Sequence, residues 1–244
     1  MTLTAVKTVR EYAIETPQTI PVFEKLGIDY CCGGNRPLNE ACAAAHFNLE
    51  EVLKALEAAA AEPVRPTEKQ IRAGSLAELI GHIVRTHHVF VRREVPQLES
   101  LLEKVCAKHG ANHPELVHIR SLFHGLGQEL MTHLMKEENI LFPYIERMEE
   151  AVVQHDPILP PPFGTVANPV HMMEHEHDSA GIALRALREA SRDFAPPADA
   201  CTSFQALYRE LAEFEKDLHR HIHLENNVLF PRAVEMEENH NRAE

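Results

Sequence analysis

Two segments of the chain repeat the same pattern of metal-binding side chains. Residues 133–143 read HLMKEENILFP and residues 221–231 read HIHLENNVLFP, with identical residues at the first, fifth, seventh, ninth, tenth and eleventh places. In each segment His and Glu are four residues apart, so both side chains share one face of a helix. An imidazole beside a carboxylate, presented twice, predicts a two-metal site.

The composition excludes several classes of partner. The chain has 244 residues and a formal charge of −13, from 24 basic and 37 acidic residues, which argues against nucleic acid and anionic membranes. It lacks the long apolar run of a membrane span and the apolar core of a signal peptide, so we expect a cytoplasmic protein. Its five cysteines are odd in number and unevenly spaced, as expected of reduced thiols. The sequence leaves a homodimer open.

The first part of the chain predicts a small helical domain over residues 1–62. Asn48 is an expected helix N-cap, because Glu51 follows three residues later. The segment CCGGNR (31–36) must be a turn, since two adjacent glycines disrupt a helix. The prolines of residues 63–73 predict a linker. Helices are expected near residues 6–15, 18–26, 37–46 and 48–61.

Residues 74–244 predict an antiparallel four-helix bundle. Segment 155–169 contains five prolines and cannot be helical. Alternation typical of strands is absent, so the expected fold class is all-α. Each helix has an apolar stripe with a spacing of three and four residues, as a bundle core requires. The four helices are expected near residues 75–108, 114–149, 169–192 and 200–237.

Histidine and glutamate interrupt these stripes at six places. His133 follows His88 by 45 residues and His221 follows His177 by 44, which indicates a duplicated helical hairpin. Six polar side chains in one core cost several kcal/mol or more unless they are paired, and a metal ion would satisfy them better than hydrogen bonds alone. The predicted metal ligands are His88, His133, Glu137, His177, His221 and Glu225.

This ligand set suits iron, manganese or zinc. We expect Glu137 and Glu225 to bridge two ions that also share an oxo or hydroxo group. Each ion is then about five-coordinate and has room for one small ligand. At one position two histidines compete. His88 continues an apolar stripe, whereas the alternative ligand, His87, leads toward a charged residue.

Two acidic residues and two prolines close to these ligands leave alternatives open. Glu129 lies one turn before His133, and Glu176 precedes His177. Each either orients an imidazole N–H or lines an ion path, or is simply an exposed helical glutamate. Pro143 and Pro231 each follow a ligand glutamate by six residues. Each either kinks its helix or marks the helix end.

At these residues the chain resembles the hemerythrin-like di-iron bundles. The oxygen-carrying members have another histidine one turn after the third-helix ligand, where this chain has Gly181. The resemblance is closer to the repair-of-iron-centres family, through IDYCCGG (28–34), HLMKEENILFP, EHDSAG (176–181) and HLENNVLFP. That family often has Tyr where this chain has His87.

Membership of this family implies two non-heme iron ions held by the six ligands. It also implies repair of iron–sulfur clusters damaged by nitrosative or oxidative stress, with damaged iron–sulfur proteins as partners and iron donation as the mechanism. Reduction of nitric oxide, or binding of nitric oxide or oxygen, is the alternative. Whether the protein is an enzyme depends on which of these holds. With one histidine fewer than the oxygen carriers, we expect a more open and labile iron.

The pair Cys31 and Cys32 precedes two glycines in the predicted turn. Its thiols are expected to be accessible, with a lowered pKa where they meet a helix N-terminus. Such thiols would engage a partner, a damaged cluster or the iron itself. The alternative is that small side chains simply pack where the turn is tight.

Overall fold

The computed structural model describes residues 7–63 and 73–243, and these residues form helices and no β-strand. Their single strand-like contact is an isolated bridge between Thr8 and Pro37. The all-α prediction is therefore confirmed for the described part of the chain. The expected linker, 63–73, lies almost wholly outside the described residues. None of the helices in the described ranges is long and apolar enough to cross a membrane.

Short helices make up the N-terminal unit, as the sequence predicted. Thr8 and Glu11 form a capping box at the first helix, and the Asn48 side chain accepts hydrogen bonds from the backbone N–H groups of Glu50 and Glu51. Residues 31–36 form the predicted turn. The helices are α1 (Val9–Glu15), α2 (Ile20–Leu26), α3 (Leu38–Ala44) and α4 (Leu49–Ala60), with a 3-10 turn, η1 (Pro17–Thr19), before α2.

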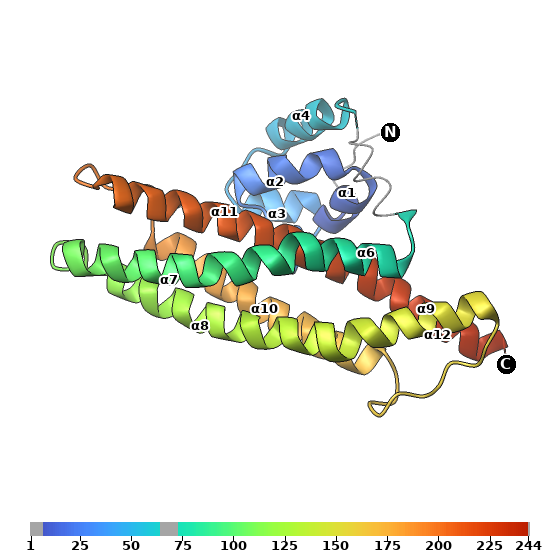
Figure 1. Ribbon diagram of the computed structural model, residues 1–244. Helices are drawn as coiled ribbons and strands as arrows, with labels where there is room; N and C mark the ends of the chain where they lie inside the picture. The colour runs from blue at the N-terminus through green and yellow to red at the C-terminus, as the bar shows by residue number, and fades with distance from the viewer. Residues whose placement is uncertain (1–6, 64–72, 244) are drawn as a thin grey trace.

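Beyond residue 73, the described chain forms four long helical rods that lie side by side, and successive rods run in opposite directions (Figure 1). Three rods contain a π-turn of five residues. The first rod consists of α6 (Leu76–Ile83), η2 (Val84–His88) and α7 (Val89–His109). The second consists of α8 (Glu115–Lys136), η3 (Glu137–Leu141) and α9 (Phe142–Gln154). The third is α10 (Ala167–Ala190), and the fourth consists of α11 (Thr202–Leu224), η4 (Glu225–Leu229) and α12 (Phe230–Ala243).

The two prolines of the repeated segments do not end their helical rods, and each is the second residue of the α-helix that follows a π-turn. Each follows a π-turn, in which the N–H of Phe142 donates to the carbonyl of Glu137, and that of Phe230 to the carbonyl of Glu225. A π-turn already departs from the regular ladder, so a proline beside it costs less than one in a helix interior. The helical chain therefore continues to residue 154 in one copy and to residue 243 in the other.

Two apolar clusters fill the bundle on either side of a polar layer. One contains Leu130, Leu134 and Ile222 and extends into the N-terminal unit. The other contains Phe142 and Phe230 and lies toward the end formed by α9 and α12. The repeated segments cross from one cluster to the other, which puts their His and Glu residues between the clusters.

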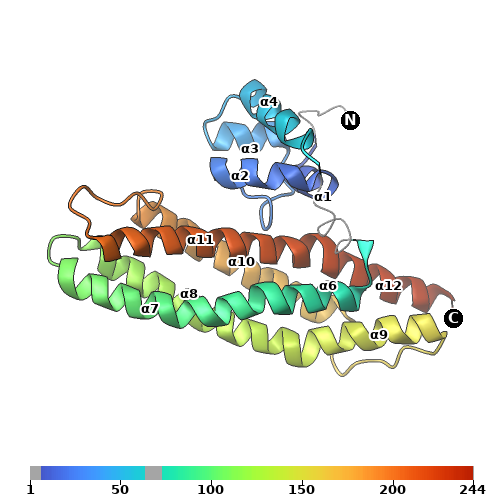
Figure 2. The same cartoon turned by 45° about the horizontal axis from the view of Figure 1, so that its top comes forward.

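The N-terminal unit packs against the fourth rod (Figures 1 and 2). Arg220 of α11 donates to both carboxylate oxygens of Glu24, at 2.7 and 2.9 Å. The Tyr30 ring meets the edges of the His219 and His223 rings, and its backbone carbonyl accepts from Asn227 at 3.2 Å. These contacts bring the 31–36 turn close to the polar layer.

Candidate metal centre

The structure brings all six predicted ligand residues into the polar layer between the clusters. None has more than 2% of its surface exposed. His88 is the last residue of η2, while Glu137 and Glu225 are the first residues of η3 and η4. The π-turns therefore carry three of the six, in keeping with the frequent occurrence of such turns at functional sites.

The six side chains form two groups that share both carboxylates. His88 and His221 belong to one group, and His133 and His177 to the other. Within each group of two histidines and two glutamates, one ligand atom per residue lies within 4.8 Å of all the others. We call these groups the 88/221 side and the 133/177 side.

Each carboxylate faces both sides of the centre. Glu137 Oε2 lies 3.4 Å from His88 Nε2, and its Oε1 lies 3.3 Å from His133 Nε2. Glu225 Oε1 lies 2.9 Å from His221 Nε2, and its Oε2 lies 3.2 Å from His177 Nε2. The Nε2 atoms also converge in pairs, at 3.1 Å between His88 and His221 and 3.0 Å between His133 and His177.

These side chains would be better satisfied by metal ions than by hydrogen bonds to one another. Both oxygens of Glu137 and Oε2 of Glu225 are buried without a hydrogen-bond partner among the described residues. Two adjacent carboxylates with no exposed surface repel one another and lose their hydration, a cost that cations between them would offset. The arrangement is suited to holding metal ions through nitrogen and oxygen donors.

The buried carboxylates also change the pKa values of the histidines around them. Burial lowers the pKa of His88, but the adjacent carboxylates of Glu137 and Glu225 outweigh it and raise this pKa to about 10. His133 is affected in the same way, and Glu137 is the main cause of the rise in its pKa to about 9. In His221 burial prevails, and the pKa is lowered. The raised pKa values of His88 and His133 favour a proton on each of these two imidazoles at neutral pH, and a bound metal ion would displace it.

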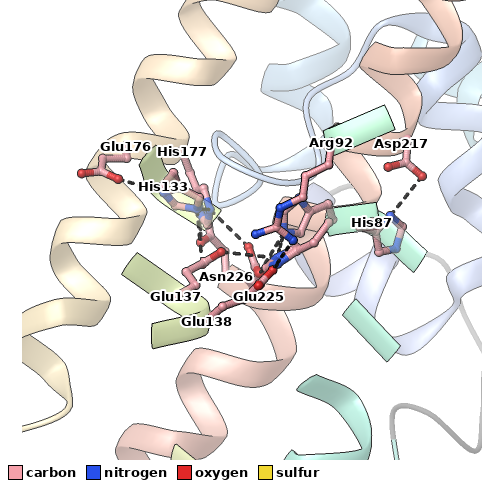
Figure 3. Close-up of polar contacts among 12 residues, drawn as sticks. His87, Arg92, His133, Glu137, Glu138, Glu176, His177, Asp217, Glu225 and Asn226 are labelled. Carbon is pink, nitrogen blue, oxygen red and sulfur yellow. Dashed lines mark hydrogen bonds and ion pairs between the residues drawn. The ribbon is translucent and has the colours of Figure 1, made fainter. Parts of the chain in front are cut away.

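Hydrogen bonds at Nδ1 orient three of the four imidazoles so that Nε2 faces the centre. His88 Nδ1 pairs with Glu138 Oε1 at 2.6 Å. Arg92 donates to the same oxygen at 2.7 Å, and both Arg92 and Glu138 are labelled in Figure 3. His133 Nδ1 pairs with Glu176 Oε2 at 2.8 Å, and Lys136 also contacts Glu176. His177 Nδ1 pairs with Asn226 Oδ1 at 2.7 Å. Each acceptor leaves Nε2 free to face the centre.

Glu138 and Asn226 were missed by the sequence analysis, although a signal for them was present. Each directly follows a shared glutamate, at the same place in the two repeated segments. The two segments share an acceptor oxygen at that position, provided by a carboxylate in Glu138 and by an amide in Asn226. Of the two acids that were considered, Glu176 contacts His133, whereas Glu129 is exposed and lines a cavity beside the centre.

The repeated phenylalanine also has a role at the centre. The Phe142 ring stacks on His88 at 5.6 Å between centroids, and the Phe230 ring stacks on His177 at 6.1 Å. Each copy of the repeated segment therefore provides a His, a shared Glu, an Nδ1 acceptor and an apolar cover for the imidazole of the preceding helix. This explains why the two segments match over most of their length.

His87, the alternative to His88, lies outside the centre. Its Nδ1 is 3.0 Å from Asp217 Oδ1, and its ring stacks parallel to His221 at 5.6 Å. It precedes His88 as Glu176 precedes His177, so the two occupy equivalent places. Glu176 pairs with His133 Nδ1, whereas His221 Nδ1 has no hydrogen-bond partner among the described residues.

A cavity of about 430 Å³ opens beside the 133/177 side. It lies between α8 and α10, and His133 and His177 form part of its wall together with Glu129, Lys136 and Glu176. A small molecule or a hydrated ion can therefore approach this side of the centre along a partly charged wall.

The structure corrects the expectation of an accessible, acidic thiol for Cys31, whereas Cys32 is half-buried. Cys31 is buried, and its neighbour Cys32 together with burial raises the pKa of the Cys31 thiol well above its ordinary value. The turn faces α10, where the Cys32 thiol donates to the backbone carbonyl of His177 at 3.4 Å. A Cβ at Gly181 would lie 3.5 Å from Cys32 Sγ. The turn therefore covers the place at which oxygen carriers have their additional histidine.

Comparison with known proteins agrees with this architecture. The family model for the hemerythrin HHE cation-binding domain matches residues 79–233, and the ScdA_N model, described as a domain of unknown function, matches residues 5–60. A probable iron-sulfur cluster repair protein of Haemophilus influenzae is 36% identical over 224 residues, which covers 92% of this chain and 95% of the relative.

Relatives from other bacteria are equally similar. The iron-sulfur cluster repair protein YtfE of Pectobacterium carotovorum is 36% identical over 92% of this chain and 95% of its own length. The YtfE protein of Escherichia coli O8 is 36% identical over 92% of this chain and 94% of its own length. The chain therefore belongs to the family of YtfE-type proteins and contains a hemerythrin HHE cation-binding domain.

Proposed function

We propose that the protein holds two iron ions and repairs damaged iron–sulfur clusters by donating iron. The observation that carries the di-iron proposal is the pair of fully buried carboxylates, each with one oxygen toward either histidine pair. His88 and His221 would hold one ion and His133 and His177 the other, while Glu137 and Glu225 would bridge them. The repair activity is supported by the similarity to iron-sulfur cluster repair proteins.

Bound iron would supply a redox-active cation with an affinity for small ligands such as nitric oxide or oxygen. The chain's own residues orient the imidazoles, keep water from the 88/221 side and open the 133/177 side to a cavity. Iron as cargo would leave through that cavity, where Glu129 and Glu176 offer carboxylate oxygens and Lys136 limits the negative charge. The proposed clients are cytoplasmic iron–sulfur proteins that have lost iron.

Transfer of labelled iron tests this function directly. Protein loaded with ⁵⁷Fe is mixed with a dehydratase whose cluster has lost iron, and the recovered activity is compared with the ⁵⁷Fe found in the rebuilt cluster. We expect both to rise together. The Glu137→Leu variant serves as the control and is expected to give neither, because a bridging carboxylate is missing.

A parallel measurement addresses the alternative activity. The same iron-loaded protein is exposed to nitric oxide with a chemical reductant, and the product is counted per protein molecule. Fewer than one turnover supports iron donation. Many turnovers, or recovery of the dehydratase without ⁵⁷Fe in its cluster, would reject donation in favour of a reductase.

A further inference from the structure

The N-terminal turn gathers a second set of metal-binding atoms, apart from the histidine centre. The two sulfurs of Cys31 and Cys32 lie 3.6 Å apart. A carboxylate oxygen of Asp29 and both sulfurs all lie within 4.8 Å of one another. Asp29 Oδ1 accepts the backbone N–H groups of Cys31 and Cys32, both at 3.0 Å, which holds the three side chains on the inside of one turn.

The spacing of these atoms suits a thiolate metal site. Two sulfurs bound to a tetrahedral ion at about 2.3 Å stand roughly 3.8 Å apart, close to the 3.6 Å between Cys31 and Cys32. Adjacent cysteines seldom direct both sulfurs to one point without a constraint. Gly34 permits the tight turn that carries the two cysteines here, because a Cβ at this position would lie 2.7 Å from the carbonyl oxygen of Tyr30.

Surrounding residues set the position, the charge balance and the accessibility of this group of atoms. Cys32 contacts the backbone carbonyl of His177, so one face of the site is fixed against α10. Arg185 lies 3.6 Å from Asp29 Oδ2 and balances part of the charge that two thiolates and a carboxylate would create. Cys32 is half-buried, which leaves an approach for an ion, whereas Cys31 is buried.

We propose that Asp29, Cys31 and Cys32 form a second metal site that takes a thiophilic divalent cation of the Fe²⁺ or Zn²⁺ class. On binding, each thiol loses its proton to solvent and its sulfur becomes a ligand, and no atom changes oxidation state. Cations of this class favour thiolate, whereas the histidine centre offers imidazole and carboxylate. The inference goes beyond cluster repair and does not depend on it.

Cobalt(II) is a suitable probe, because thiolate ligands give it an intense near-ultraviolet charge-transfer band that imidazole and carboxylate ligands do not. Iron-loaded protein is titrated with Co²⁺ without oxygen. We expect the band to appear and to saturate at one Co²⁺ per chain. It should be lost in the Cys31→Ser/Cys32→Ser variant and retained in Cys201→Ser, which removes a thiol outside the turn.

Asp29→Asn tests the third ligand without breaking the turn, since the Asn oxygen still accepts the two backbone N–H groups. We expect the band to remain and to require more Co²⁺ for saturation. Unchanged affinity in this variant would overturn the three-ligand site. Absence of the band in the native protein, or its loss in Cys201→Ser, would overturn the site altogether.

Thiol protection keeps the test independent of the folding of any variant. Native protein is alkylated with N-ethylmaleimide with and without Zn²⁺, and the modified cysteines are identified by mass spectrometry. Zn²⁺ is expected to protect Cys32 and to leave the labelling of Cys201 unchanged. Equal labelling of Cys32 in both samples would contradict the site. Failure of the di-iron proposal would appear in the iron content and would leave these results unchanged.

Discussion

The 88/221 and 133/177 sides of the centre are built from the same parts but have different surroundings. Each side has two histidines and faces one oxygen of each buried glutamate. On each side a further carboxylate pairs with an imidazole Nδ1 and also contacts a basic side chain. On the 88/221 side this carboxylate is Glu138, which is paired with Arg92, and on the other it is Glu176, which is paired with Lys136. Only the 133/177 side borders the cavity.

The difference shows that equivalent ligands in the two halves have unequal access to solvent. The repeated segments supply equivalent His and Glu residues, whereas the residues preceding the first histidine of each half, His87 and Glu176, are different. His87 places an aromatic ring against His221. Glu176 places a charge beside the cavity. We therefore expect the ion on the 133/177 side to exchange first.

Removal of a shared carboxylate should have the largest effect, because it affects both sides at once. In Glu137→Leu and in Glu225→Leu we expect the iron content to fall from two ions per chain to nearly none. Iron analysis and the absorption spectrum of the paired site measure this. Glu146→Leu, which changes an exposed glutamate of α9, is the matched control. Retention of one tightly bound ion in either variant would mean that the carboxylates are not shared.

Removal of one Nδ1 carboxylate should affect one side more than the other. Glu138→Gln and Glu176→Gln are each expected to weaken iron binding on their own side by about 10–100-fold, the usual effect of losing such a partner. Iron release to a chelator should then show two phases. In Glu176→Gln the faster phase should accelerate, and in Glu138→Gln the slower one. The same phase changing in both variants would show that the two sides do not act separately.

The pH dependence of stability should reveal one exchangeable proton on each side. The pKa values of His88 and His133 are raised to about 10 and about 9 in the folded protein, above the ordinary histidine value of 6.5. Their contribution to stability is therefore complete below pH 6.5 and is lost as the pH rises through 9 to 10. Each pKa unit corresponds to about 1.4 kcal/mol of folding free energy.

Urea unfolding of the metal-free and iron-loaded proteins between pH 6.5 and 10 measures this loss. The metal-free protein should become less stable across the range. The iron-loaded protein should change much less, since the ions have replaced the protons. Parallel curves for the two forms would argue against protons and metal sharing the site.

The smallest effect is expected for His87, which touches the 88/221 side only through its ring. His87→Phe keeps an aromatic ring beside His221 and removes the hydrogen bond to Asp217. We expect iron affinity to fall less than about tenfold, below the range for a lost Nδ1 partner. Chelator competition measures this, and complete loss of one ion would instead make His87 a ligand.

Much of the centre could be predicted from sequence because its geometry follows the helix repeat. His133 and Glu137 are neighbours on any helix, and the apolar stripes selected His88 over His87 through residues up to Val95. The Nδ1 acceptors were harder to find, because Glu138 and Asn226 bind histidines on another helix. Their partners depend on how the helical rods pack together, and the spacing of residues within one helix does not determine that packing.

The π-turns and the chemistry of the turn were beyond prediction for a related reason. A proline in a helical segment indicates a disturbance, but a kink, a helix end and a π-turn all account for Pro143. Likewise, the adjacent glycines identified a turn at 31–36, whereas its contact with α10 depends on the docking of the N-terminal unit. In the docked unit Cys32 contacts α10, and the neighbouring Cys32 thiol together with burial raises the pKa of Cys31 instead of lowering it.

The π-turns also fix the rotational phase of each repeated segment. One additional residue in the turn sets Phe142 and Phe230 at the angle at which their rings cover His88 and His177. Deletion of one residue from η3 or η4 would restore an ordinary helix and turn everything beyond it by about 100°. The His–Glu pair and the phenylalanine would then face different directions. Single-residue deletions should therefore be far more damaging in these two segments than conservative substitutions.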